Sequence, residues 1–409
     1  MDASLVHPYI SGMNRDYGVI VIGCGGLGSA ALYRLAKELG QAVLGIEQFH
    51  LGHNRGASQD HSRIIRLAQH QSAYAALAPH AYEAWSEVEE ESGVRIQFKT
   101  GGLIIEAPDE RDPEKVGTRN VEGYVAAFEE HGFDYEMLGP LELMRRWPQF
   151  HLEGSERAIF QKDTGLVDAR KANAVHVALA RAHGAPILEE TPVRAVRPNG
   201  EGVEVVTDGE TYLADGVVVT CDAWTNEVLA ETGARVPQTV TQEQVTYYAT
   251  PNLKPFSPER FPVFMWHGRD NFYGFPVYGE VATNLGQHMG GLAEPVTAES
   301  RTFEPDPIRV ERYREFLGRY IPGFLGPELY TRTCLYTIPP DQNFVIDTLP
   351  EHPQVSVAIG AGHAYKFAGL IGRILSELAL EGESTFPIEA FGLDRPAISD
   401  AAFERTFHV

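Results

Sequence analysis

The sequence predicts a protein of the α/β class with a second domain of the α+β class, and three observations support this. An apolar run at residues 17–22 leads into a glycine-rich loop, Gly23–Gly28, and then into apolar residues at helical spacing up to Leu39. Strand and helix patterns alternate again at residues 167–220 and 355–381. The chain between these segments contains mostly strand patterns, which favours a separate mixed sheet.

The first strand, loop and helix have the features of a dinucleotide-binding unit. In Gly23-Cys-Gly-Gly-Leu-Gly28, Gly23 permits the tight bend, Gly25 lets a pyrophosphate approach the backbone, and Gly28 lets the helix pack closely on the strand. The phosphates would lie at the helix N-terminus, where N–H groups are free. Glu47 ends the next apolar run, 19 residues after Gly28, where a carboxylate would accept hydrogen bonds from ribose hydroxyls. These features predict NAD or FAD and argue against a 2′-phosphate.

The next elements follow in order along the chain. A long helix is expected through residues 74–85, and strand patterns begin at Phe98–Ile105 and continue in patches to about residue 158. An alanine-rich helix then runs to Ala182, and three strand patterns follow it. The last of these, Gly216–Thr220, has the composition of a fully buried strand.

The C-terminal half completes the two predicted domains. Residues 235–330 are rich in strand patterns and aromatic residues, and a last helix is expected from Lys366 to about Glu381. A nucleotide domain built from interleaved segments suits a flavin enzyme better than a dehydrogenase with one uninterrupted Rossmann domain. We therefore expect a Rossmann-like FAD-binding domain from residues 15–97, 159–233 and 331–385, a mixed-sheet substrate domain from residues 98–158 and 234–330, and a C-terminal segment, residues 386–409.

Composition disfavours several classes of partner. The net charge of −22 should repel nucleic acid and acidic membrane surfaces. No apolar stretch is long enough to cross a bilayer, and residues 1–15 lack the basic and apolar regions of an export signal. Cys24, Cys221 and Cys334 are an odd number at unrelated spacings, which suits a reducing compartment and leaves no zinc pattern. We expect a cytoplasmic monomer without nucleic acid, membrane or metal partners.

Six short motifs occur in one order along the chain: Gly23–Gly28, Gly56–Arg66, Tyr273–Pro276, Leu285–His288, Cys334–Thr337 and Gly362–Phe367. In this order and spacing the chain resembles the monomeric sarcosine oxidase family of FAD-dependent amine oxidases, from about residue 16 to about residue 398. That family includes N-methyltryptophan oxidase, pipecolate oxidase and fructosyl amino acid oxidase. The resemblance implies oxidation of a secondary (N-methyl or N-alkyl) or primary amino acid to an imine that hydrolyses, with molecular oxygen as acceptor and hydrogen peroxide as product.

The resemblance also implies roles for single residues. Cys334 matches the cysteine that forms a thioether to the 8α-methyl group of FAD. Arg63 matches an arginine near the flavin ring, whereas Arg66 and Lys366 match residues that bind the substrate carboxylate. Spacing alone would place Arg63 and Arg66 on one face of a helical turn, or close together in an irregular one. Lys366 is expected to begin a helix, an unfavourable end for a cation unless an anion lies nearby.

Further matches complete the candidate site. Tyr273, His288 and Tyr336 match active-site positions of the family, and His363 matches a family histidine, whereas His61 and His267 are expected to be structural or surface residues. The candidate catalytic residues are Arg63, Arg66, Tyr273, His288, Tyr336 and Lys366. The candidate cofactor-binding residues are Gly23, Gly25, Gly28, Glu47, Ser62, Arg63, Cys334, Gly362, His363 and Lys366.

The chain departs from the family's pattern at several positions. Asn284 stands where the family's oxidases commonly carry a lysine associated with oxygen activation. Gln59 and Asp60 replace a pair that usually contains histidine, and Asp222 stands where glycine is common. Three alternatives therefore stay open. They are a flavin amine dehydrogenase with another electron acceptor, an NAD-linked dehydrogenase, which would leave Cys334 unexplained, and a redox-inactive flavoprotein or binding module.

Overall fold

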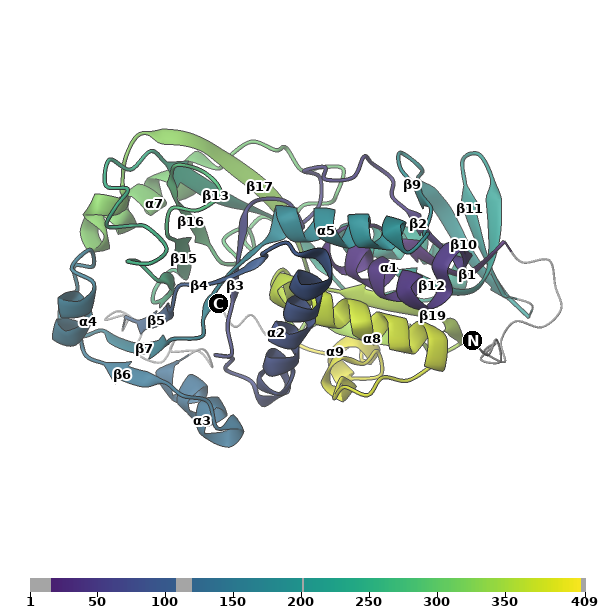
Figure 1. Ribbon diagram of the computed structural model, residues 1–409, viewed down its shortest axis with the longest axis horizontal. Coiled ribbons are helices and arrows are strands. Elements are labelled where there is room, and N and C mark those ends of the chain that lie inside the picture. Colours follow the sequence, from purple (N-terminus) through teal and green to yellow (C-terminus); the bar gives the residue numbers. More distant parts are fainter. Residues whose placement is uncertain (1–15, 108–119, 201, 406–409) are drawn as a thin grey trace.

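The computed structural model describes residues 16–107, 120–200 and 202–405 (Figure 1). Two eight-stranded sheets lie in opposite halves of the molecule, and a three-stranded sheet has the order β3-β8-β4. The three strands of the small sheet are β3 (Ser62–Ile65), β8 (Gly165–Asp168) and β4 (Gln97–Lys99). Among the described residues, no helix has both the length and the apolar character needed to cross a membrane.

The first large sheet contains the predicted βαβ unit. Its main path is β10-β11-β12-β1-β2-β9, with β19 against β12 and β18 against β19. Strand β1 runs parallel to both β2 and β12, and β12 runs parallel to β19, so strands from both ends of the chain meet in this sheet. The strands are β1 (Tyr17–Ile22), β2 (Val43–Ile46), β9 (Ile187–Leu188), β10 (Val193–Asn199), β11 (Gly202–Thr207), β12 (Thr211–Val219), β18 (Val345–Leu349) and β19 (His352–Ile359).

Four helices cover one face of this sheet. Helix α1 (Gly26–Leu39) packs between α5 (Ala169–Ala182) and α8 (Ala368–Glu381), and α2 (Ser72–Ser92) packs on α8 (Figure 1). The helices α1 and α8 approach so closely that a Cβ at Gly372 would lie 2.5 Å from Ala30. The helices predicted around residues 74–85, up to Ala182 and from about Lys366 to Glu381 are therefore confirmed.

The second large sheet has the order β17-β13-β16-β15-β14-β5-β7-β6. Side chains alternate between its faces, so Arg332, Cys334 and Tyr336 of β17 share the face opposite to that of the buried Leu335. An aromatic core that includes Phe264 packs on this second face together with α7. The elements of this half are β5 (Gly102–Glu106), β6 (Glu136–Leu138), β7 (Arg157–Gln161), β13 (Thr239–Tyr248), β14 (Val263–His267), β15 (Phe272–Phe275), β16 (Thr283–Gln287), β17 (Glu328–Ile338), α3 (Val121–His131), α4 (Pro140–Arg146) and α7 (Pro307–Tyr320).

Two features of this half differ from the expectation. Helices α3 and α4 lie where only strand patterns were expected. The residues of α3 are helical because Val121, Tyr124 and Phe128 bury one face at helical spacing and Asn120 caps the N-terminus by accepting from the Gly123 N–H. The strands β7 and β17, parts of which were assigned to the FAD-binding segments, pair within the second sheet, while the domain boundaries themselves stay a prediction.

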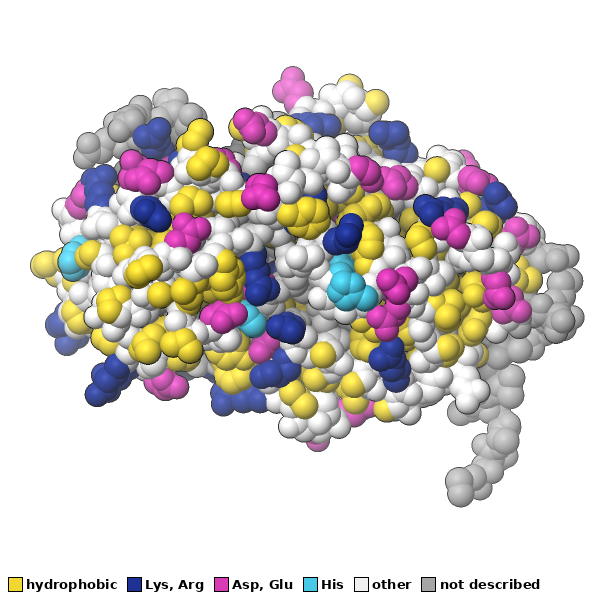
Figure 2. Space-filling model, turned by 90° about the horizontal axis from the view of Figure 1, so that it is seen from above, with side chains coloured by type: hydrophobic (Ala, Val, Ile, Leu, Met, Phe, Trp, Pro, Cys, Tyr) yellow, Lys and Arg dark blue, Asp and Glu magenta, His cyan; other side chains and the backbone are white. Residues whose placement is uncertain are grey.

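Acidic and basic side chains are interspersed on the face of the molecule that Figure 2 shows, rather than gathered by sign. The large negative net charge is therefore not concentrated in one patch on that face.

Candidate active site

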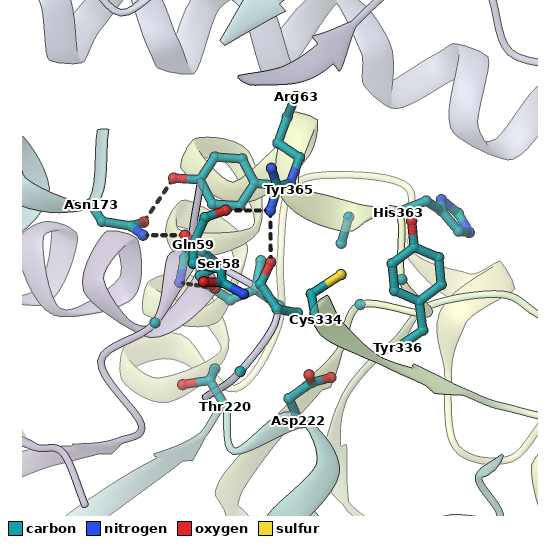
Figure 3. Close-up of a pocket in the computed structure, with 18 of the residues that line it drawn as sticks. Ser58, Gln59, Arg63, Asn173, Thr220, Asp222, Cys334, Tyr336, His363 and Tyr365 are labelled. Carbon is teal, nitrogen blue, oxygen red and sulfur yellow. Dashed lines mark hydrogen bonds between the residues drawn. The ribbon is translucent and has the colours of Figure 1, made fainter. Parts of the chain in front are cut away.

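A cavity of about 1330 Å³ is lined by side chains from both large sheets and from the loop between β2 and β3. Pockets for drug-sized ligands usually measure about 300–1,000 Å³, so this volume suits a dinucleotide together with a small substrate. Figure 3 shows part of its wall, with Cys334 and Tyr336 on one strand and Thr220 and Asp222 beyond another. The candidate residues that line the cavity are Gly23, Gly25, Glu47, Ser62, Arg63, Arg66, Tyr273, His288, Cys334, Tyr336, Gly362, His363 and Lys366.

The glycine-rich turn begins the cavity at the carboxyl end of β1. Gly23 has φ +87°, a backbone conformation that favours glycine, and its N–H donates to the Ile46 carbonyl at 2.8 Å. Gly28 packs behind the turn, because a Cβ there would lie 1.7 Å from the Gly23 carbonyl oxygen and 2.4 Å from Thr220 Oγ1. Gly28 therefore lets helix α1 pack closely behind β1, the role expected for the third glycine.

We expect Gly28→Ala to disrupt this turn. The added methyl group would overlap backbone that cannot move aside, and overpacking of this kind costs about 1–3 kcal/mol or more. The variant should unfold at lower temperature and be purified with less FAD. Gly18→Ala is the matched control, since its Cβ would lie 3.4 Å from the nearest atom, the Ala42 carbonyl oxygen. Equal melting temperature and FAD content in both variants would contradict this role for Gly28.

Two side chains hold the loops around the turn. The Glu47 carboxylate accepts hydrogen bonds from the Cys24 N–H at 2.9 Å and from the Phe49 N–H at 3.1 Å. Ser58 Oγ accepts from the Gly26 N–H at 2.7 Å, at the start of α1 (Figure 3). The Ser58 hydroxyl therefore lies where a phosphate group is expected, although only its neighbours in the 56–66 motif were singled out from the sequence.

Arg63 belongs to strand β3, so the expectation that it shares a helical turn with Arg66 is wrong. Its guanidinium donates to the carbonyls of Ser62 at 2.9 Å and Ala57 at 3.0 Å, and lies 5.6 Å from the ring centre of Tyr365. Burial lowers the pKa of Arg63, but nearby acidic groups raise it above its ordinary value, so the side chain is cationic.

Arg66 follows β3 directly and lies against Tyr124 of α3. Its guanidinium donates to the Ala68 carbonyl and to the Tyr124 hydroxyl, at 3.2 Å. Among the described residues, no carboxylate lies within ion-pair distance of Arg66. His267, expected to be a structural or surface residue, stacks its ring on Tyr124 at 5.9 Å and also lines the cavity, whereas His61 bonds to Glu280 at 3.2 Å.

Cys334 lies on the cavity face of β17. Burial raises the pKa of its thiol to about 11, although the Arg63 and Arg301 guanidiniums lower it in part. Arg301 is only 5% exposed and donates to the Thr333 carbonyl at 2.8 Å, directly beside the cysteine. Gln59 donates to the same carbonyl at 2.5 Å. The backbone at Cys334 is therefore held from two sides.

Three aromatic side chains line the cavity together with Cys334, and they are Tyr336, His288 and Tyr273. The Tyr336 ring lies against Gly362, because a Cβ added at Gly362 would be 2.2 Å from it. The centre of the His288 ring is 5.9 Å from the centre of the Tyr336 ring. Tyr273 covers Gly286 in the same way. Burial raises the pKa of Tyr273 well above its ordinary value, so the phenol is neutral at physiological pH.

Lys366 lies in a 3-10 turn, Ala364–Phe367, immediately before α8. The side chain is only 7% exposed, and its ammonium group donates to the His363 carbonyl at 2.6 Å. The His363 ring lies 3.1 Å from the Gln342 carbonyl oxygen through Nε2. Lys366 is therefore a buried cation beside the cavity and not a surface lysine.

The positions where the chain departs from the family also line the cavity. Asn284 is only 1% exposed, and its Oδ1 has no hydrogen-bond partner among the residues that the structure describes. Asp60 has φ +85° and accepts a hydrogen bond from the buried Tyr247 hydroxyl at 2.6 Å. Asp222 has φ +47°, and burial raises its pKa to about 6 while the Thr337 hydroxyl lowers it in part.

The residues present fit a flavin dinucleotide. Gly23 and Gly25 of the turn, Glu47 directly after β2, and the Cys334 thiol all line the same cavity. Asn284 and Asp222 also line this cavity, and their Oδ1 and Oδ2 atoms respectively are buried without hydrogen-bond partners among the described residues. In the part of the chain that the structure describes, no group of three or more His, Cys, Asp or Glu residues could hold a metal ion.

Comparisons with known proteins agree with this arrangement. Residues 18–378 match the model of a family described as FAD-dependent oxidoreductases. The chain is 34% identical to a monomeric sarcosine oxidase of Streptomyces avermitilis, over 95% of this chain and 100% of the relative. It is 30% identical to an N-methyl-L-tryptophan oxidase of Yersinia pestis, over 93% and 99%. The solved structure of NikD, an amino acid oxidase essential for nikkomycin biosynthesis, superposes with a TM-score of 0.83 at 25% identity, over 96% and 100%.

Proposed function

The chain belongs to the FAD-dependent oxidoreductase family, and from this premise we propose that it oxidises a secondary or primary amino acid at the carbon next to nitrogen. The imine formed would then hydrolyse. One observation carries the proposal: a single cavity contains the dinucleotide-binding turn, a thiol and two cations, Arg66 and Lys366, that suit a carboxylate. The sarcosine and N-methyltryptophan oxidases among the relatives support N-methyl or N-alkyl amino acids as the substrate class.

The cofactor would be held at both ends. Gly23 and Gly25 would contact the pyrophosphate, Glu47 the adenosine ribose, and Arg63 the flavin ring. Cys334 would hold FAD covalently through its sulfur, since it is the cysteine on the cavity face of β17. Ser62, Gly362 and His363 line the cavity and complete the proposed cofactor contacts. The segments expected for a FAD-binding domain include the strands of the first sheet, which supports the proposed division into two domains.

When bound, FAD would accept the hydrogen and electron pair that leave the carbon next to nitrogen. Arg66 and Lys366 would bind the carboxylate and orient that carbon. The amine must be neutral, because a protonated nitrogen has no lone pair to support the developing iminium ion. Tyr273 and His288, which line the cavity, would contact the amine and adjust its protonation. Lys366 would also stabilise negative charge gained by the reduced ring.

Anaerobic reduction of the bound flavin by a panel of N-alkyl amino acids tests this proposal. We expect at least one of them to bleach the visible flavin absorbance, and the matching amine without a carboxylate to act more slowly. No bleaching by any amino acid would leave only a redox-inactive flavoprotein. A colourless protein that binds NAD instead would refute the flavin chemistry.

The electron acceptor depends on Asn284. The names of the relatives favour oxygen, but a neutral, buried amide here lacks the charge that would stabilise developing superoxide. We therefore propose slow reoxidation by oxygen, and an amine dehydrogenase with another acceptor is the second candidate function. With either function, we propose a cytoplasmic location and a monomeric state.

We expect Asn284→Lys to accelerate reoxidation by oxygen by roughly ten- to a hundredfold, the range for one charge-assisted contact, with a smaller effect on flavin reduction. Stopped-flow mixing of the reduced protein with oxygen measures this rate. Asn284→Met is the control for side-chain length without charge. Fast reoxidation of the unmodified protein, unchanged by the lysine, would mean that Lys366 or Arg63 supplies the charge.

A further inference from the structure

A cofactor that extends from the glycine-rich turn to Cys334 would pass the acidic side chain of Asp222. Thr220 lies at the turn, since its hydroxyl donates to the Gly23 carbonyl at 2.7 Å. Two residues later, Asp222 begins a 3-10 turn, Asp222–Trp224, that packs against β17, the strand of Cys334. Figure 3 shows Thr220, Asp222 and Cys334 along this wall. Asp222 therefore lies between the expected phosphate position and the expected attachment point.

Asp222 combines an uncommon backbone conformation with a carboxyl group at the cavity wall. Its φ of +47° lies in the left-handed region that side chains other than glycine rarely adopt. Its Oδ2 is buried within the protein and has no hydrogen-bond partner among the described residues, while the Thr337 hydroxyl lies near enough to the carboxyl to lower its pKa in part. Asp222 also lines the cavity, and a carboxylate accepts hydrogen bonds and does not donate them, so a ligand group that contacts it there must be a donor.

The chemistry of the cofactor identifies this donor. The phosphates are anionic acceptors and cannot donate to a carboxylate. The dimethylbenzene edge of the flavin, which would face Cys334, has no polar hydrogen. Between these two parts lies the ribityl chain, which carries hydroxyl groups at C2′, C3′ and C4′. These hydroxyls are the donors that this stretch of FAD offers.

We propose that Asp222 is a cofactor-binding residue whose carboxylate accepts a hydrogen bond from a ribityl hydroxyl of FAD, an inference that rests on the proposed flavin chemistry. Asp222 then selects for the ribityl chain itself, in addition to the contacts at the phosphates and the ring. A flavin without the bonded hydroxyl would lose this contact to the carboxylate.

Equilibrium binding of FAD to a Cys334→Ser parent tests the proposal, because without the thiol the affinity can be measured by quenching of flavin fluorescence. Asp222→Gly keeps the left-handed backbone and removes the carboxylate, and Asp222→Asn keeps the shape without the charge. We expect binding to weaken roughly ten- to a hundredfold for glycine and less for asparagine, the range for a charge-assisted hydrogen bond. Thermal unfolding of the FAD-free variants checks that they are folded.

FAD analogues that lack one ribityl hydroxyl separate direct contact from a structural effect. The analogue without the bonded hydroxyl should bind the parent about as weakly as FAD binds Asp222→Gly. Its affinity for Asp222→Gly should be no lower than its affinity for the parent. Equal affinity of parent and Asp222→Gly for FAD, or the same loss for every analogue in both proteins, would overturn the inference and leave the flavin proposal intact. Failure of the parent to bind FAD would overturn both.

Discussion

Cys334→Ser is expected to release all of its flavin on denaturation, whereas the unmodified protein should stay yellow after acid precipitation. A thioether requires a nucleophilic sulfur, and serine cannot supply one. Digestion of the unmodified protein should yield a flavin peptide that contains Cys334, which mass spectrometry would identify. If the serine variant keeps the flavin attached, or the unmodified protein releases it, the proposed attachment is wrong.

The other two cysteines provide matched controls. Cys24 is buried beneath the turn, and burial raises its pKa well above the ordinary value. The Cys221 thiol donates to the Ile22 carbonyl at 3.4 Å, and burial raises its pKa also. Neither thiol lies beside a guanidinium pair such as Arg63 and Arg301 at Cys334. Cys24→Ser and Cys221→Ser should therefore both retain covalent flavin.

Arg66→Ala is expected to weaken binding of amino acid substrates by roughly ten- to a hundredfold while the flavin stays bound, since a charge-assisted contact is worth about 1.5–3 kcal/mol. The guanidinium already has contacts to the Ala68 carbonyl and the Tyr124 hydroxyl that fix its position, and a substrate carboxylate would supply the missing anion. Substrate titrations under anaerobic conditions measure this affinity.

Two comparisons make the test of Arg66 specific. Arg145→Ala removes the same charge from an exposed pair with Glu142, and should leave substrate affinity unchanged. The unmodified protein should prefer an amino acid over the amine that lacks its carboxylate, and Arg66→Ala should lose that preference. Equal binding of the two compounds by the unmodified protein would refute a carboxylate site.

Local patterns were sufficient to predict part of the fold. The strand, glycine turn and helix at residues 17–39 were predictable because each depends on residues close in sequence. Helix α7 was not predicted, although Asp306 caps its N-terminus and Tyr313, Phe316 and Leu317 bury one face at helical spacing. Strand β3, which has only four residues, was not predicted either. Strand β3 depends on pairing with β8, about a hundred residues away, and this pairing also overrode the helical-turn interpretation of Arg63 and Arg66.

The candidate site, like the fold, could be predicted only in part. The short motifs predicted which side chains would line one cavity, although their roles stay predictions. Tyr365 was not predicted as a wall residue, because its position depends on a hydrogen bond from its hydroxyl to Asn173 Oδ1, 192 residues apart in sequence, at 2.7 Å. The stacking of His267 on Tyr124, which joins β14 to α3, could not be predicted for the same reason. A single histidine carries no local signal of such a contact.

Strands β1, β12 and β19 pair in parallel although they are far apart in sequence, and this affects the order of events during synthesis. The glycine turn at Gly23 emerges from the ribosome early, but its neighbour β12 follows much later and β19 close to the end. Pairing over such sequence separations makes folding slow, because the intervening chain must be ordered first. Cys334 can face the turn only when nearly the whole polypeptide exists. Flavin capture and the proposed thioether formation would therefore be late steps, and a nascent chain must stay free of aggregation without help from its cofactor.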